Sequence, residues 1–318
     1  MWLEIVDRQK FVELAYQRGN ELNLSNKNYR VYVETFFEKE YQDDVGCGDV
    51  TSNSVLTKNE FRSAFLIIKT DGVISGLEEV CWFLRKHGLT VTFYTKDGSD
   101  VEKGETVLKL GGGQKDILAT ERIALNVLQR MSGIATETKR LTHLLKDYNT
   151  RIAATRKTLL RYFDKKAVFF GGGLTHRFGL WDSVLIKDNH LEALKQEGIV
   201  DYIESAIAKA SVFADQVDFI ELEVTTIEEA VKAARKFKEL QLKTPCVIML
   251  DNMKPAEIKQ TLETLRDLSL YDNLLFEASG DITTDNILEY AKTGIDVISL
   301  GYLTHSVCVL DMSLEMAL

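Results

Sequence analysis

A regular alternation of short apolar runs and longer helical segments, in the second half of the chain, constrains the fold more than any other feature. The apolar runs cover residues 151–155, 183–186, 219–224, 246–250, 274–276 and 297–300. Most of the segments between them are long enough for a helix and have helical spacing. Repeated strand–helix units of this kind predict a parallel sheet, either closed as a barrel or open with helices on both faces.

A charged residue stands at or just past the end of five of these runs. These residues are Arg156, Lys187, Glu223, Asp251 and Glu277, and Gly301 closes the sixth run. Parallel strands are covered on both faces, so a charge at this position is accommodated most easily where it opens onto the strand ends. In α/β barrels the carboxyl ends of the strands form the active site. The pattern therefore predicts a functional site at this edge.

The first part of the chain has a different pattern. Helical spacing covers residues 9–42, β-like runs follow at 63–69, 90–95 and 106–110, and a helix interrupts them near residues 77–84. With 318 residues the chain can form about two domains. We expect an α+β sandwich domain over residues 1–125 and a barrel domain over residues 126–318, with the C-terminal tail returning to the N-terminal domain.

Composition limits the partners of the chain. The sequence has 39 Lys and Arg against 48 Asp and Glu, a net charge of −9, so we expect binding neither to nucleic acid nor to an anionic membrane. Any bound anion has to meet a local basic cluster. The acidic N-terminal segment and the lack of a long apolar run predict a cytoplasmic protein. The four scattered cysteines predict reduced, mostly buried thiols without a zinc site or disulfide framework.

Basic residues gather on consecutive strand–helix units. Arg156 and Lys157 follow the first run, His176 and Arg177 follow a glycine-rich segment, and Lys187 follows the second run. Arginine offers a planar fork and lysine a compact charge, so the cluster suits a small substrate with more than one carboxylate. A solvated charge explains Lys157 alone equally well.

Acidic residues and glycine turns follow in the later units. Glu221 and Glu223 share one face of a strand, and Asp251 ends the next run; a half-exposed polar face fits Glu221 better than Glu223. Such carboxylates can hold a divalent cation, bind ribose hydroxyls or stabilise developing positive charge. The turns 279–282 and 300–303, the second near His305, predict a phosphate site at strand–helix junctions.

Together, and in this order, these motifs resemble the quinolinate phosphoribosyltransferase family, the decarboxylating nicotinate-nucleotide pyrophosphorylases. The resemblance extends from about Asp44 to Asp311. The matching stretches are residues 48–51, 121–126, 132–136, 155–158, 171–177, 185–190, 221–224, 249–252, 277–280 and 298–306.

The resemblance implies an N-terminal sandwich domain and an incomplete, seven-stranded parallel α/β barrel of the type II phosphoribosyltransferase kind, although the pattern yields six strands. It implies transfer of a 5-phosphoribosyl group from phosphoribosyl pyrophosphate to quinolinate, with loss of carbon dioxide and pyrophosphate, in NAD biosynthesis. It also implies Mg²⁺ bound with phosphoribosyl pyrophosphate, no organic cofactor, and a homodimer with shared active sites.

The resemblance also implies a role for each candidate residue. The substrate carboxylates are expected to bind Arg156, Arg177 and Lys187, with Lys157 and His176 beside them, and Arg122 is expected to reach the neighbouring subunit's site. Glu223 and Asp251 are expected to bind the ribose and magnesium. The phosphate is expected to bind at Ser279, Gly280, Asp281, Gly301 and His305. The residues expected to act in catalysis are Lys157, Lys187, Glu223 and Asp251.

Asp281 departs from the family pattern, because Gly or Asn is common at this position. An acid beside a phosphate loop is unfavourable, so we expect its side chain to turn away and cap a helix at Thr283. The loop after Thr158 is shorter than the family's by about two residues, which alters lid closure or substrate fit.

Other functions stay open. A related phosphoribosyltransferase could act on nicotinate or another carboxylate, although the density of cations favours a dicarboxylate. A barrel lyase could form a Schiff base on Lys187, which borohydride trapping would reveal. A binding protein without catalysis is the least favoured, given the full set of site residues.

Overall fold

The structure is a computed structural model that describes residues 7–317. The chain forms two compact units. The barrel unit contains the segment that ends at Arg18, together with 141–157 and 173–301. The sandwich unit contains 19–140, 158–172 and the segment that begins at Tyr302. The expected division of the chain at residues 125 and 126 stays a prediction.

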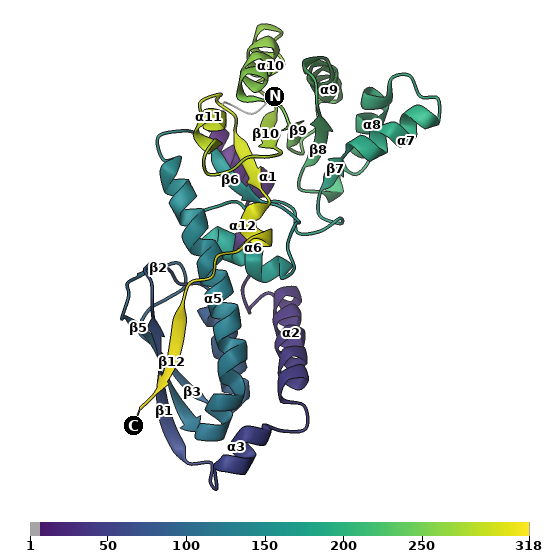
Figure 1. The fold of residues 1–318 in the computed structure, drawn as a ribbon. Helices are drawn as coiled ribbons and strands as arrows, with labels where there is room; N and C mark the ends of the chain where they lie inside the picture. The colour runs from purple at the N-terminus through teal and green to yellow at the C-terminus, as the bar shows by residue number, and fades with distance from the viewer. Residues whose placement is uncertain (1–6, 318) are drawn as a thin grey trace. The chain divides into compact units, whose positions relative to one another are not determined.

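All six apolar runs form strands of one parallel sheet in the barrel unit (Figure 1). The order in the sheet is β6-β11-β10-β9-β8-β7. The strands are β6 (Arg151–Ala154), β7 (Val184–Ile186), β8 (Ile220–Val224), β9 (Cys246–Asp251), β10 (Leu275–Ser279) and β11 (Val297–Leu300).

The seventh strand of the expected barrel is represented by a single β-bridge. Leu174 pairs in parallel with Ala153 on the free edge of β6, where the strand between β6 and β7 in chain order would lie. A single bridge carries no apolar run, so the sequence pattern could not reveal it. The incomplete parallel barrel is therefore confirmed, with six strands and a remnant of the seventh.

Helices follow the strands and also cover their amino ends. The helices are α7 (Asp188–Gln196), α8 (Tyr202–Ser211), α9 (Ile227–Leu240), α10 (Pro255–Asp267) and α11 (Ile287–Ala291), with a 3₁₀ turn η2 (Ala214–Gln216). The first helix, α1 (Arg8–Tyr16), packs Val12 and Tyr16 into a buried cluster with Phe219, Val247 and Leu275, which stand at or next to the first residues of their strands. Because α1 occupies the amino ends, the carboxyl ends are left for a site.

The sandwich unit contains a four-stranded antiparallel sheet in the order β12-β1-β5-β3. The C-terminal strand β12 pairs with β1 over residues 64–68 and 312–316. The strands of this sheet are β1 (Phe61–Ile68), β3 (Thr90–Phe93), β5 (Thr106–Gly113) and β12 (Met312–Met316). Two short strands, β2 (Gly72–Val73) and β4 (Asp100–Val101), pair with each other in a separate two-stranded sheet.

The helices of the sandwich unit are η1 (Gly19–Glu21), α2 (Lys27–Val45), α3 (Val50–Val55), α4 (Leu77–Lys86), α5 (Gln114–Leu144), α6 (Arg161–Phe170) and α12 (Tyr302–His305), and the end of α5 passes into the barrel unit. The helical spacing over residues 9–42 belongs to two helices, since Asn26 accepts the N–H groups of Asn28 and Tyr29 and starts α2.

Two further features are the burial of the cysteines and the length and apolar character of the helices. Cys81 and Cys246 are buried thiols, but Cys47 and Cys308 are exposed, so the expectation of mostly buried cysteines is wrong for half of them. Within residues 7–317, no helix combines the length and apolar character that a membrane span requires.

Candidate active site

Lys187 and Glu223 form an ion pair at the strand ends of the barrel unit. Lys187 follows β7 directly, and its Nζ lies 3.2 Å from Glu223 Oε2 on β8. The Lys187 side chain is 47% exposed and the Glu223 side chain 11%. Partial burial raises the pKa of Glu223, with smaller contributions from Asp251 and Asp188, although Lys187 opposes the shift. Glu223 is thus a carboxylate in a partly dry environment with one cation beside it.

Asp251 ends β9 and is held from two sides. It lies opposite Ser279 of β10 in the strand register. Its Oδ1 accepts a short hydrogen bond from Ser279 Oγ, and its Oδ2 accepts one from Asn252 Nδ2 at 2.6 Å. Asn252 adopts a left-handed backbone (φ 55°), which Asn tolerates well. These contacts fix the Asp251 carboxylate next to the turn expected to bind phosphate.

The turn after β10 requires a residue without a side chain. Gly280 has φ +90°, and a Cβ atom there would lie 2.1 Å from Asn252 Oδ1. Asp281 also has a positive φ of 45°, which explains why Gly or Asn suits this position. The expected capping by Asp281 is wrong, because the Thr283 N–H donates to Asn286 Oδ1 instead. The Asn286 side chain also donates to the Asp281 carbonyl and closes the turn itself.

The basic residues occupy two different environments. Arg156 and Lys157 are exposed after β6, whereas Arg177 is only 6% exposed. Burial lowers the pKa of Arg177, and the charge of nearby Arg156 lowers it further, while Glu221, Asp182 and Glu277 oppose the shift. An arginine stays protonated under such shifts. The positive charges of Arg156 and Arg177 therefore act on each other, and this mutual repulsion favours binding of an anion.

His176, Glu221 and Glu277 form a buried group that the sequence did not predict as a unit. Glu221 and Glu277 are fully buried, and His176 is 5% exposed. The half-exposed face expected for Glu221 is therefore wrong, because α1 covers it and Tyr16 OH donates to Glu221 Oε1 at 3.4 Å. Glu277 lies inside β10, whose pattern continues past the apolar run, and not at its end.

The two buried carboxylates differ in the direction of their pKa shifts. Burial and the neighbouring Glu277 raise the pKa of Glu221 well above its ordinary value. Burial also acts against ionisation of Glu277, but hydrogen bonds from His176, Ser299 and Tyr16 hold its pKa below the ordinary value. Two carboxylates this close do not both ionise in a dry site. Glu277 is thus the more acidic member of the pair and Glu221 the less acidic one.

Two candidate residues belong to the sandwich unit. Arg122 is exposed on α5, and His305 is the last residue of α12, with its Nδ1 2.6 Å from Ser306 Oγ. Gly301 directly follows β11 in the barrel unit. The roles of Arg122, His305 and Gly301 stay predictions.

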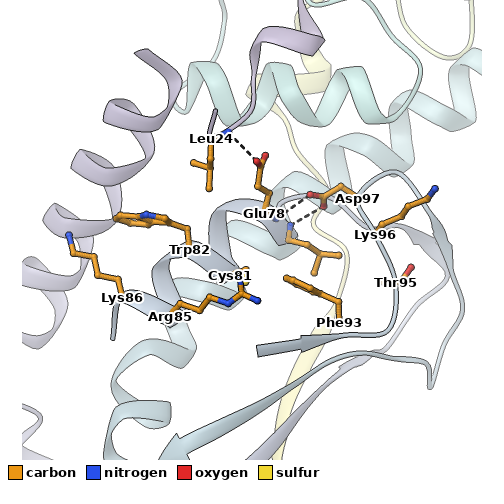
Figure 2. A pocket seen from close by; sticks show the side chains of 11 residues that line it. Leu24, Glu78, Cys81, Trp82, Arg85, Lys86, Phe93, Thr95, Lys96 and Asp97 are labelled. Atoms are coloured by element: carbon orange, nitrogen blue, oxygen red, sulfur yellow. Dashed lines mark hydrogen bonds between the residues drawn. The ribbon is translucent and has the colours of Figure 1, made fainter. Parts of the chain in front are cut away.

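A cavity in the sandwich unit contains none of the candidate residues. It measures about 630 Å³ and is lined mainly by α4 and the turn after β3. Figure 2 shows Asp97 next to Glu78, the second residue of α4. Both acids serve the fold, since Glu78 accepts from the Leu24 N–H and Asp97 from the N–H groups of Leu77 and Glu78. The candidate site is therefore the strand ends of the barrel unit.

Parallel strands ending in paired cations, two carboxylates and a glycine turn define an enzyme of the α/β-barrel class that handles an anionic substrate. Two family models match the chain: "Quinolinate phosphoribosyl transferase, N-terminal domain" over residues 49–132 and "Quinolinate phosphoribosyl transferase, C-terminal domain" over residues 134–315. The chain belongs to the quinolinate phosphoribosyltransferase family.

Individual proteins agree with this assignment. The chain is 40% identical over 279 residues to a probable nicotinate-nucleotide pyrophosphorylase [carboxylating] of Methanothermobacter thermautotrophicus, covering 86% of this chain and 94% of the relative. The solved nicotinate-nucleotide pyrophosphorylase from Francisella tularensis matches with a TM-score of 0.77 and 31% identity, over 90% of this chain and 96% of that one. A human nicotinic acid phosphoribosyltransferase structure, at 13% identity and TM-score 0.55, shares the fold alone.

Proposed function

We propose that this chain transfers the 5-phosphoribosyl group of phosphoribosyl pyrophosphate to quinolinate, releasing pyrophosphate and carbon dioxide and forming nicotinate mononucleotide. One observation carries the proposal: a buried cation with a cationic neighbour, Arg177 with Arg156, occurs in the same barrel unit as the carboxylates Glu223 and Asp251. A dicarboxylate needs the first group, and a sugar that becomes positively charged needs the second.

Arg177 and Arg156 supply the attraction for the two quinolinate carboxylates. A guanidinium with little access to water makes charge-assisted, bidentate hydrogen bonds that hold a planar acid in one orientation. Lys157 and Lys187 add two exposed positive charges at the strand ends. This arrangement places the ring nitrogen of quinolinate in a fixed direction for attack on the sugar.

Glu223 and Asp251 serve the ribose. As pyrophosphate leaves, positive charge develops at the sugar carbon and its ring oxygen, and a fixed carboxylate stabilises it. Asp251 is held by Ser279 and Asn252, so it needs no reorganisation during the reaction. The backbone N–H groups of the turns at Ser279, Gly280, Asp281 and Gly301 bind the 5-phosphate.

Members of this family use phosphoribosyl pyrophosphate, a substrate that generally requires a divalent metal. The donor set fits Mg²⁺, because Glu223 and Asp251 are carboxylates on the adjacent strands β8 and β9, and Mg²⁺ is bound through one or two carboxylates plus substrate phosphates. When bound, the ion neutralises charge on the leaving pyrophosphate.

Decarboxylation follows from the same binding mode. Once its nitrogen is bonded to the sugar, the pyridine ring is cationic and accepts the electron pair of the breaking carbon–carbon bond. Carbon dioxide leaves, and the ring carbon then takes up a proton. The cations have to release the departing carboxylate while they keep the other one, which favours a mobile Lys157 or Lys187 on that side.

The test is direct measurement of the products. Purified enzyme with quinolinate, phosphoribosyl pyrophosphate and Mg²⁺ should release pyrophosphate and carbon dioxide in equal amounts. Nicotinate in place of quinolinate should give far slower pyrophosphate release. Equal rates with nicotinate would favour the second candidate function, a nicotinate-specific enzyme on the same fold.

The Schiff-base lyase is disfavoured by the ion pair of Lys187 with Glu223, since a Schiff-base lysine reacts as a neutral amine. Trapping of a keto acid by borohydride on Lys187 would reverse this conclusion. We also propose a homodimer in which Arg122 enters the partner's site, and a cytoplasmic location. Both rest on the sequence arguments and the resemblance.

A further inference from the structure

His176, Glu221 and Glu277 resemble a metal site at first sight. One ligand atom from each lies within 4.8 Å of the others, and all three side chains are buried. His176 Nε2 is 3.3 Å from Glu277 Oε2 and 3.6 Å from Glu221 Oε2. The other ring nitrogen decides against a metal, because Nδ1 accepts a hydrogen bond from the Arg177 backbone N–H at 2.7 Å. A neutral ring with an acceptor at Nδ1 carries its proton on Nε2, which then cannot bind a metal.

Backbone and ring contacts restrict the orientation of the His176 imidazole. Its backbone is left-handed (φ 53°), and its N–H donates to the Tyr16 carbonyl at 3.0 Å. The rings of Tyr16 and Phe219 pack edge-on against it, with centroids at 4.9 and 5.3 Å. Such packing, together with Nε2 against the two carboxylates, leaves the ring one orientation.

The orientation of the His176 ring affects Arg177, the next residue. The Arg177 backbone N–H donates to His176 Nδ1, and this hydrogen bond fixes the Arg177 backbone. The Arg177 guanidinium is buried, and its Nη1 lies 3.5 Å from the Ser183 carbonyl. A change in the ring would therefore move the cation that we assign to a substrate carboxylate. Both ring nitrogens already face protein groups, so a direct contact of the ring with substrate is disfavoured.

We propose that His176 is a positioning residue that holds Arg177 in its substrate-binding orientation, and that Glu277 fixes the His176 ring for this purpose. This inference rests on the proposed function, and it replaces the direct substrate contact expected for His176.

Two amide variants of His176 distinguish the role of Nδ1 from the role of Nε2. Asn places an oxygen near the Nδ1 position and tolerates a left-handed backbone, whereas Gln places an amide near Nε2 and leaves Nδ1 without a substitute. His176→Asn should keep the KM for quinolinate within about threefold, and His176→Gln should raise it at least about tenfold, with the KM for phosphoribosyl pyrophosphate unchanged in both. The opposite order would show that Nε2 contacts the substrate and would overturn the proposal.

Coupling between the two residues tests the part played by Glu277. Glu277→Gln should raise the KM for quinolinate about fivefold in the natural chain and have almost no effect in the His176→Asn background, where no ring remains to be fixed. Equal effects in both backgrounds would mean that Glu277 does not act through His176. Thermal melting of each variant separates loss of positioning from loss of folding.

A spectroscopic test needs no activity. In protein labelled with ¹⁵N-histidine, one of the five histidines should be a neutral ring with its proton on Nε2, and this signal should vanish in His176→Asn. A doubly protonated His176, or a proton on Nδ1, would overturn the proposal. If the tautomer is as expected but the wild-type enzyme forms no nicotinate mononucleotide, the proposed function fails while the geometry stands.

Discussion

At the scale of single residues, the two carboxylates at the strand ends differ in what holds them. Glu223 is bound on one oxygen by the half-exposed Lys187, whereas both oxygens of Asp251 are fixed by Ser279 and Asn252. A rigid acid can stabilise charge without reorganising, and a paired acid can release its lysine to a substrate. This difference gives each residue a separate consequence on substitution.

Lys187→Met should lower kcat/KM for quinolinate by at least about a hundredfold, equivalent to about 3 kcal/mol, because a substrate carboxylate then lacks its cation. Folding should survive, since Lys187 is 47% exposed. Steady-state kinetics and a thermal melt measure the two effects. Lys232→Met on the exposed face of α9 is the control and should change neither. Near-normal activity of the Lys187 variant would remove it from the site.

Glu223→Gln and Asp251→Asn should lower kcat more than quinolinate affinity, because both acids act on charge that appears only in the transition state. We expect losses of about 10²-fold or more in kcat, as for other preorganised charge-stabilising groups. Quinolinate binding, measured by calorimetry, reports the other quantity. Glu228→Gln, on the surface of α9, is the matched control. A parallel loss of quinolinate affinity in both site variants would point to collapse of the strand ends.

At the scale of elements, the start of α4 depends on a residue from another segment. Its N-cap, Gly76, has no side chain, and Asp97 accepts the first N–H groups of the helix instead, at 2.9 and 3.2 Å. Burial and the nearby Glu79 raise the pKa of Asp97 to about 6, although Lys166 and these N–H groups oppose the shift. The ionised Asp97 that caps the helix therefore lowers the free energy of unfolding by an amount that depends on pH.

The sign of that cost follows from proton binding. Between about pH 4 and pH 6, folded Asp97 retains a proton that the unfolded chain has released, so the free energy of unfolding falls as pH rises through this window and stays lower above it. Asp97→Asn cannot titrate, so its stability relative to wild type should increase by about 2–3 kcal/mol from pH 4 to pH 7. Urea unfolding at both pH values measures this. A difference between Asp97→Asn and wild type that stays the same at both pH values would refute this cost of the cap.

The sequence predicted the elements better than their surroundings. All six strands were found because apolar runs and alternation are local features. The burial of Glu221 was missed because Tyr16, some two hundred positions away, covers it, and local spacing shows only which face a side chain takes. The Leu174 bridge and the left-handed His176 leave no periodic signal at all. Asn252, which fixes the Asp251 carboxylate, could have been found, since Asn at the end of a strand suits a positive φ.

At the scale of the whole molecule, the candidate residues divide between the two compact units. Most lie on the strand ends of the barrel unit, whereas Arg122 lies on α5 in the sandwich unit and is exposed. A symmetric dimer with two shared sites gives such a residue a function in the partner's site. In such a dimer, inactivating substitutions on different residues can complement each other.

Mixing two inactive variants tests this directly. Arg122→Ala and Lys187→Ala should each be nearly inactive alone, and co-assembly should restore activity, because a heterodimer has one site with neither defect and one with both. Random mixing at equal amounts should give about a quarter of wild-type activity, since half of the dimers are mixed and half of their sites are intact. Activity should scale with the fraction of heterodimer, measured by capture of one tagged chain. Glu137→Ala, farther along α5, replaces Arg122→Ala as a control and should not depend on mixing. Mixed dimers without recovered activity would show that Arg122 does not act in trans.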